Sequence, residues 1–248
     1  MSKSVKNEWF ESWFDSPYYH LLYNNRDHSE AENYITKLLG YLNLSKESTL
    51  LDLGCGKGRH SFHLHKNGYK VHGIDLSHES IIYANNEYGT KDLDFSQGDM
   101  RESFGKKKYD CVLNLFTSFG YFEDDSENNK VIHNVKEALK PKAIFVQDFL
   151  NAQWVRNTLK ENETQERGDI AFKISRRIEN GFVKKQIQFD VEEKSYSFQE
   201  EVRLLETEDF KQLYDENELE LLNIFGSYDL KEFDAQKSNR LILISQSK

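Results

Sequence analysis

Short apolar stretches alternate with segments of helical spacing over residues 49–150. The apolar stretches are short enough to be buried strands rather than helices. They cover residues 49–53, 69–74, 93–96, 109–116 and 143–149. Before the last of them, apolar residues recur at helical spacing over 131–139, until Lys140-Pro141 ends the element. Strands joined by crossovers of helix length predict an α/β fold with a doubly wound, mostly parallel sheet.

A different pattern follows residue 150. Apolar and polar residues alternate over 172–178, 187–191 and 196–204, as in half-buried strands. Asn180-Gly181 separates the first two runs and suits a type I′ turn, because both residues tolerate positive φ. We therefore expect a three-stranded antiparallel insertion after strand five, within residues 151–205, that overhangs the carboxyl edge of the sheet. A helix near residue 207 and strands at 219–225 and 240–245 complete a seven-stranded core formed by 1–150 and 206–248.

The N-terminal segment is rich in aromatic residues. Trp9, Phe10, Trp13 and Phe14 form one stripe of a helix, which we expect Pro17 to end. Ser29 and Glu32 then form a capping-box pattern ahead of a second helix that we expect to stop at Gly40. These helices precede the first predicted strand.

Composition narrows the class of protein. The chain has 33 Lys and Arg against 42 Asp and Glu, a net charge of -9, which disfavours nucleic acid and anionic membrane surfaces as partners. No segment is apolar and long enough for a signal peptide or a membrane span. Cys55 and Cys111 lie in or beside apolar runs, as expected for reduced thiols of a cytoplasmic protein.

The most informative segment is residues 51–59, LDLGCGKGR, which closes the first strand and opens a helix. Glycines at 54, 56 and 58 allow a sharp turn and a close approach of the backbone to a ligand. Asp75 ends the second strand, where its carboxylate can accept hydrogen bonds from a ribose diol. The strand–turn–helix–strand spacing brings Asp75 to the glycine turn, so the pair predicts a nucleoside site.

Two further segments complete the predicted pocket. Asp99 can accept a hydrogen bond from the exocyclic amine of adenine, and the Met100 amide can donate to a ring nitrogen. Residues 114–121 end the fourth strand with apolar and aromatic side chains among a few hydroxyl and amide groups, a composition typical of small-molecule pockets.

Residues 51–58 with Asp75, Gly98-Asp99-Met100 and Leu139-Lys140-Pro141, in this order, resemble the motif series of class I S-adenosylmethionine-dependent methyltransferases. The resemblance implies a small-molecule methyltransferase whose seven-stranded sheet is parallel except for its last strand. Residues 18–27 look like an N-terminal segment that folds over the cofactor. One departure is Lys142-Ala143, where the family has glycine after the Lys-Pro turn. The cofactor-binding residues implied are Tyr19, Arg26, Gly54, Cys55, Gly56, Gly58, Asp75, Leu76, Asp99, Met100 and Leu115.

Alternative functions remain open at this point. A dinucleotide oxidoreductase would place its third glycine one position later, where this chain has Arg59. A non-catalytic nucleotide-binding or regulatory module could use the same fold. Histidines 60, 63, 65, 72 and 78 cluster in the sequence, but no carboxylate or thiolate joins them at ligand spacing, so we expect no metal site.

The methyl acceptor cannot be read from the sequence. We expect it to be a small molecule bound near Tyr19, His20, Phe116, Tyr121 and Arg203, the last on the third strand of the insertion. A general base is needed only if the acceptor is protonated. His20, Asp148 and the tyrosines of 18–23 are candidates by location alone, so the catalytic residue is left unassigned.

Overall fold

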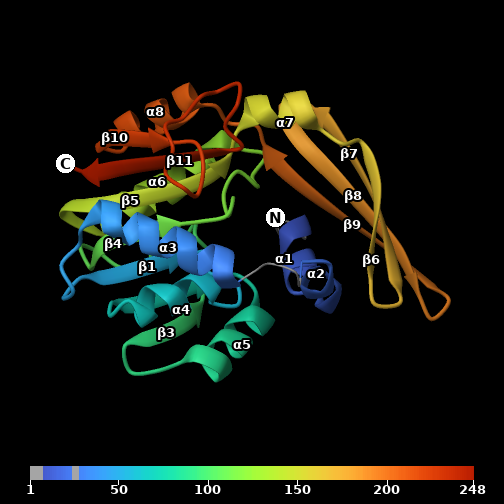
Figure 1. The fold of residues 1–248 in the computed structure, drawn as a ribbon, viewed down its shortest axis with the longest axis horizontal. Coiled ribbons are helices and arrows are strands. Elements are labelled where there is room, and N and C mark those ends of the chain that lie inside the picture. Colours follow the sequence, from blue (N-terminus) through green and yellow to red (C-terminus); the bar gives the residue numbers. More distant parts are fainter. Residues whose placement is uncertain (1–7, 24–27) are drawn as a thin grey trace, which may run out of the picture.

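The computed structural model describes residues 8–23 and 28–248, which include a seven-stranded sheet (Figure 1). The strand order is β10-β11-β5-β4-β1-β2-β3, and β11 runs antiparallel to both of its neighbours. This confirms the predicted doubly wound sheet with an antiparallel last strand. The strands are β1 Thr49–Leu53, β2 Lys70–Asp75, β3 Leu93–Gln97, β4 Tyr109–Asn114, β5 Leu139–Leu150, β10 Leu219–Phe225 and β11 Arg240–Ser247.

Helices cover both faces of this sheet (Figure 1). On one face pack α3 (His28–Leu42), α4 (Arg59–Lys66) and α5 (His78–Tyr88). On the other pack α6 (Asp125–Ala138) and α8 (Thr207–Glu216). Because side chains alternate along a strand, Leu50 packs in the core beneath α3, α4 and α5, and Leu51 packs in the core beneath α6 and α8. Both leucines are fully buried, as expected for a sheet covered on its two faces.

Some predicted element ends differ from the structure. Helix α3 spans His28–Leu42, so Ser29 lies inside the helix, and Gly40 does not end it as predicted. Helix α6 ends at Ala138, and β5 starts at Leu139, before the Lys-Pro pair. Lys142 has a φ of 63°, so the turn keeps a left-handed residue where the family has glycine.

The insertion is a second sheet of four antiparallel strands, not three: β6 (Asn162–Arg167), β7 (Ile170–Glu179), β8 (Phe182–Val191) and β9 (Lys194–Arg203). The extra strand, β6, has no apolar residue, so the period of two could not show it. Asn180 and Gly181 both have positive φ, which confirms the predicted hairpin turn. A short helix, α7 (Ala152–Thr158), precedes this sheet.

Two N-terminal helices, here called the lid helices, lie between the two sheets: α1 (Trp9–Phe14) and α2 (Pro17–Leu22) (Figure 1). Pro17 does not simply end α1 but occupies the first turn of α2, where Ser16 caps the helix and a missing N–H costs nothing. The lid helices share a buried cluster with the insertion, formed by Trp13, Leu22, Phe172, Ile174, Ile187 and Phe189. Burial of these apolar side chains therefore holds the lid helices against the insertion.

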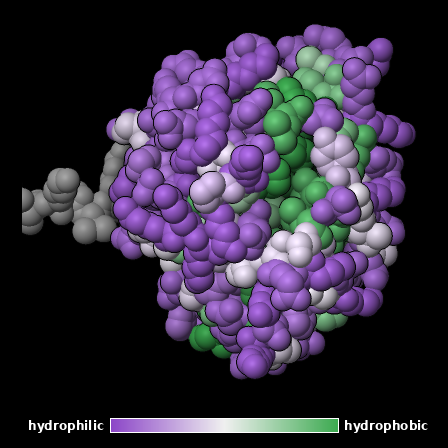
Figure 2. Space-filling view, turned by 90° about the vertical axis from the view of Figure 1, so that its left-hand side faces the viewer, coloured by the Kyte–Doolittle hydropathy of each residue, from purple (hydrophilic) through white to green (hydrophobic). Residues whose placement is uncertain are grey.

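Figure 2 shows a largely hydrophilic face on which hydrophobic side chains gather in a central band, with smaller patches near the lower edge. Among the described residues, the large hydrophobic side chains that stay exposed are Tyr41, Ile82, Tyr83, Ile178 and Leu222. No helix within the described ranges is long and apolar enough to cross a membrane.

We predict that Phe172→Ala lowers the free energy of unfolding by about 3–5 kcal/mol, because the fully buried ring fills the lid–insertion cluster. Ile178→Ala on the same strand is the control. Its side chain is 39% exposed, so the cost should be smaller, about 1 kcal/mol. Urea unfolding followed by tryptophan fluorescence measures both, and equal losses in the two variants would contradict this assignment.

Candidate cofactor and acceptor site

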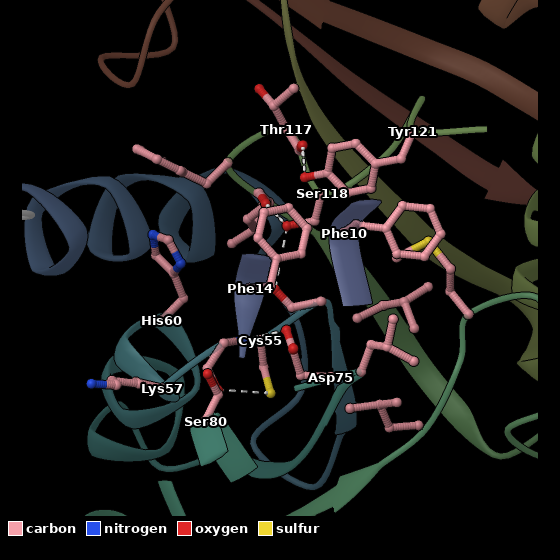
Figure 3. A pocket seen from close by; sticks show the side chains of 18 of the residues that line it. Phe10, Phe14, Cys55, Lys57, His60, Asp75, Ser80, Thr117, Ser118 and Tyr121 are labelled. Carbon is pink, nitrogen blue, oxygen red and sulfur yellow. Dashed lines mark hydrogen bonds between the residues drawn. The ribbon is translucent and has the colours of Figure 1, made fainter. Parts of the chain in front are cut away.

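A cavity of about 650 Å³ opens at the carboxyl edge of the main sheet, beneath the lid helices and against β9. Its size is that of small-molecule sites. The floor is formed by the loops that follow β1, β2, β3 and β4. Figure 3 shows the rings of Phe10, Phe14 and Tyr121 gathered above Asp75. The Phe14 and Tyr121 ring centroids are 5.4 Å apart in an edge-to-face contact.

The three glycines after β1 are needed for different reasons. Gly54 and Gly58 have positive φ, and a Cβ would lie 2.6 Å from Ser118 at the first and 2.7 Å from Phe95 at the second. Close packing against these side chains therefore explains why positions 54 and 58 are glycine. Gly56 has a φ of 53°, and a Cβ there would meet no protein atom within 4 Å. At Gly56 the backbone borders open cavity, which leaves room for a ligand.

Asp75 closes the glycine loop from the end of β2. One carboxylate oxygen accepts from the Gly56 N–H at 2.7 Å and the other from the Ser77 N–H at 2.9 Å. Burial raises the pKa of Asp75 above its ordinary value, against these two backbone hydrogen bonds. Each oxygen keeps a lone pair that can accept from a ligand hydroxyl.

Asp99, at the end of β3, is held by its neighbour Arg101. The guanidinium donates to the carboxylate at 2.6 to 3.1 Å, and the Arg101 N–H adds a bond of 2.8 Å. Burial opposes the charge on Asp99, but the bonds from Arg101 outweigh it and hold the pKa of Asp99 below its ordinary value. Asp99 is thus a fixed hydrogen-bond acceptor on the cavity wall.

The loop after β4 has a strained backbone and is held by a buried ion pair. Phe116 and Thr117 have φ of 61° and 64°, a conformation that costs a non-glycine residue roughly 1–2 kcal/mol. The Phe116 N–H donates to the buried Asp148 carboxylate at 2.8 Å, and Arg240 pairs with that carboxylate at 2.7 Å. Asp148 is 1% exposed and does not line the cavity, so it supports the loop and is not placed to serve as a base.

The upper wall carries one carboxylate, Glu200 of β9. It accepts from the Trp13 indole N–H and the Tyr23 hydroxyl, both at 2.7 Å, and lies 3.4 Å from the Lys185 ammonium. Burial lowers the pKa of Lys185, and Glu200 partly offsets the effect. Tyr23 and Glu200 line the cavity.

Most predicted site residues come together in this cavity. Arg26 lies outside the described residues, and Gly58 packs behind the loop rather than on the cavity wall. The predicted residues on the wall are Tyr19, His20, Gly54, Cys55, Gly56, Asp75, Leu76, Asp99, Met100, Leu115, Phe116 and Tyr121.

Arg203 does not line the cavity, contrary to the sequence-based expectation. Glu200 and Val202 of the same strand do, and an alternating strand turns position 203 to the opposite face. The Arg203 guanidinium instead pairs with Asp125 at 2.7 Å and lies over the Phe182 ring. The sequence analysis placed Arg203 on the correct strand but on the wrong face of that strand.

Sequence reasoning also missed three polar side chains around the cavity: Arg101, Glu200 and Arg240. Arg240 directly precedes the apolar run of residues 241–244, a signal that could have marked it as a residue at the edge of the sheet. Because β11 is antiparallel, its first residue lies at the same edge as the last residues of the parallel strands. Nothing in the local pattern distinguishes Glu200 from the neighbouring Glu201.

The histidines do not assemble a metal site within the described part of the chain. His28 and His63 approach to 3.4 Å between ring nitrogens, and His72 contacts Asp94. His60 lines the cavity beside Phe116.

Residues 44–218, more than half of the chain, match the methyltransferase-domain family. The chain is 31% identical over 99 residues to the dTDP-3-amino-3,4,6-trideoxy-alpha-D-glucopyranose N,N-dimethyltransferase of Streptomyces venezuelae, covering 40% of this chain and 41% of that enzyme. It is 26% identical over 152 residues to the glycine N-methyltransferase of Mus musculus, covering 55% of this chain and 52% of that enzyme. The chain spans about half the length of these curated relatives, or less.

A solved S-adenosylmethionine-dependent methyltransferase from Clostridium acetobutylicum superposes with a TM-score of 0.78 over 93% of this chain and 96% of that one, at 20% identity. The fold of this chain is therefore shared with a solved S-adenosylmethionine-dependent methyltransferase. The chain belongs to the methyltransferase-domain family.

A buried acid beneath the glycine loop adds a pH dependence to stability. Asp52 is 1% exposed and accepts from the Ser61 hydroxyl. Burial raises the pKa of Asp52 to about 6. The folded protein therefore holds this proton more tightly than the unfolded chain does, and stability is lost as the pH rises from about 4 through about 6.

We predict that Asp52→Asn removes this loss. The stability of the wild type relative to the variant should fall by roughly 2–3 kcal/mol between pH 4 and pH 7. Urea unfolding across this range measures the difference. Asp169→Asn, at an exposed position, should leave the pH dependence unchanged. A parallel response of wild type and Asp52→Asn would rule out a titrating Asp52.

Proposed function

We propose that this chain transfers the methyl group of S-adenosylmethionine to a small-molecule acceptor bound between the lid helices and the insertion. The observation that carries the proposal is one continuous cavity. Its floor holds Gly56, Asp75 and Asp99, and its upper wall holds Tyr23 and Glu200. A nucleoside and a second molecule can therefore meet in the same enclosed space.

The residues on the floor fit the cofactor. Asp75 offers two acceptors for ribose hydroxyls, and the cavity beside Gly56 leaves space for the chain that carries the sulfonium. Asp99 and the Met100 N–H present an acceptor and a donor that match the edge of adenine. When bound, S-adenosylmethionine supplies an electrophilic methyl group and a neutral leaving group. The protein then contributes mainly by positioning the reactants, an effect that reaches roughly 7–11 kcal/mol in well-oriented systems.

The upper wall supports an amine as the acceptor. Aromatic rings of the lid surround one carboxylate, Glu200, and aromatic faces and carboxylates both attract ammonium groups. The Tyr23 hydroxyl donates to Glu200, and its oxygen accepts from the Lys185 ammonium. Tyr23, Glu200 and Lys185 therefore form a hydrogen-bonded chain at the cavity wall through which a proton of the amine can leave. The sugar N,N-dimethyltransferase and glycine N-methyltransferase relatives lend support to this choice.

The first prediction concerns the cofactor site. Asp75→Ala should weaken binding of S-adenosylhomocysteine about 100-fold, because two charge-assisted hydrogen bonds to the ribose are lost. Calorimetric titration measures the affinity, and circular dichroism verifies folding. Asp94→Ala, an exposed acid on β3, should bind like the wild type. If the wild type does not bind S-adenosylhomocysteine, the proposed function fails. A co-purified nicotinamide or flavin would favour the oxidoreductase alternative.

The second prediction concerns the acceptor. Glycine and glucosamine should be methylated in preference to their hydroxyl counterparts glycolate and glucose. Glu200→Gln and Tyr23→Phe should lower turnover roughly 100-fold or more, because the path for the amine proton is removed. Release of S-adenosylhomocysteine, followed by chromatography, measures turnover.

The matched control is Glu201→Gln, whose carboxylate pairs with Lys184 rather than with the cavity cluster. It should keep wild-type turnover. Methylation of the hydroxyl compounds alone would contradict an amine acceptor. Binding of S-adenosylhomocysteine without turnover on a broad panel of acceptors would favour a non-catalytic module.

A further inference from the structure

The guanidinium of Arg101 joins three separate parts of the molecule. It contacts Asp99 in its own loop, Glu8 next to lid helix α1, and Glu127 in α6. Two parallel bonds, of 3.0 and 2.6 Å, reach the Glu8 carboxylate. Such a bidentate pair fixes both distance and orientation. The side chain is 16% exposed, and its guanidinium lies 5.7 Å from the centre of the Phe10 ring and 4.7 Å from that of Phe122.

Helix α1 is tied to the core at its other end as well. The Asp15 carboxylate, at the C-cap of α1, accepts from the Ser77 hydroxyl at 2.8 Å and from the Glu79 N–H at 3.0 Å. Ser77 lies two residues after Asp75 in the chain, and Arg101 lies two residues after Asp99. Both ends of α1 are therefore attached to the loops that carry the two predicted nucleoside-binding acids.

The side chains of α1 also cover the cavity. Trp9, Phe10 and Phe14 line it, and Figure 3 shows Phe10 and Phe14 over the side of the cavity that holds Asp75. A ligand held by the floor would therefore lie beneath the side chains of this helix.

We propose that Arg101 and Glu8 are positioning residues for the cofactor. Arg101 orients the Asp99 carboxylate toward the adenine amino group and, through Glu8, fastens α1 over the bound nucleoside. This inference rests on the proposed function, because it assumes that an adenine nucleoside occupies the cavity. Neither residue is placed in the chemical step.

The Asp99 carboxylate supports a preference for adenine. Of the three carboxylates that pair with the Arg101 guanidinium, only Asp99 also lines the cavity. An ionised carboxylate only accepts hydrogen bonds, so it favours a donor, such as the adenine amino group, over an acceptor. Hypoxanthine, which carries an oxygen at the same position, should be rejected because two acceptors would then face each other.

The test uses the full chain and two probes, S-adenosylhomocysteine and S-inosylhomocysteine. Arg101→Lys keeps the positive charge but loses the planar fork, so it should reduce the preference for the adenine probe about tenfold. Glu8→Gln should speed dissociation of both probes by about five- to tenfold without changing the preference, because it loosens only α1. A purely structural defect would not change the ratio of the two affinities.

The matched control is Glu11→Gln, an exposed position on α1 itself, which should release both probes at the wild-type rate. Hydrogen exchange over 9–14 without ligand gives an independent readout, and Glu8→Gln should exchange faster than Glu11→Gln. Wild-type dissociation in Glu8→Gln, or an unchanged preference in Arg101→Lys, would overturn the proposal. If no probe binds the wild type, the proposed function fails, and the attachment of α1 by Glu8 is still decided by hydrogen exchange.

Discussion

The loops at the carboxyl edge of the main sheet depend on carboxylates that accept backbone N–H groups. Asp75 accepts from Gly56 and Ser77, Asp99 from Arg101, and Asp148 from Phe116. Each acid lies at or near the end of a parallel strand. Loops that leave such strands expose N–H groups with no strand partner, and an unpaired buried donor is costly. The same acids shape the cavity, so the stability of the loops and the geometry of the site have one origin.

The cavity is completed by parts that lie far apart in the sequence. Glu200 of the insertion accepts hydrogen bonds from Trp13 and Tyr23 of the lid segment, while Asp15 and Glu8 attach that segment to the core. The lid thus contacts the floor and the upper wall at once.

Much of the fold follows from local patterns. Alternating strands and helices predict the sheet, because a strand buried on two faces needs a continuous apolar run. The glycine turn and Asp75 are predictable, because sequence spacing fixes their place at one strand edge. Strand β6 could not be predicted in this way. Its residues are polar, and pairing with β7 imposes its conformation.

The sequence by itself determined the class of fold, the cofactor motif series and most of the floor of the cavity. Only the tertiary structure decided which polar side chains surround that floor. Arg203 turned away because strand register sets the face of every side chain, and Glu200 entered in its place. Arg101 and Arg240 gained their partners from other elements. These ion pairs depend on how segments far apart in the sequence pack together, and a local sequence pattern does not contain that information.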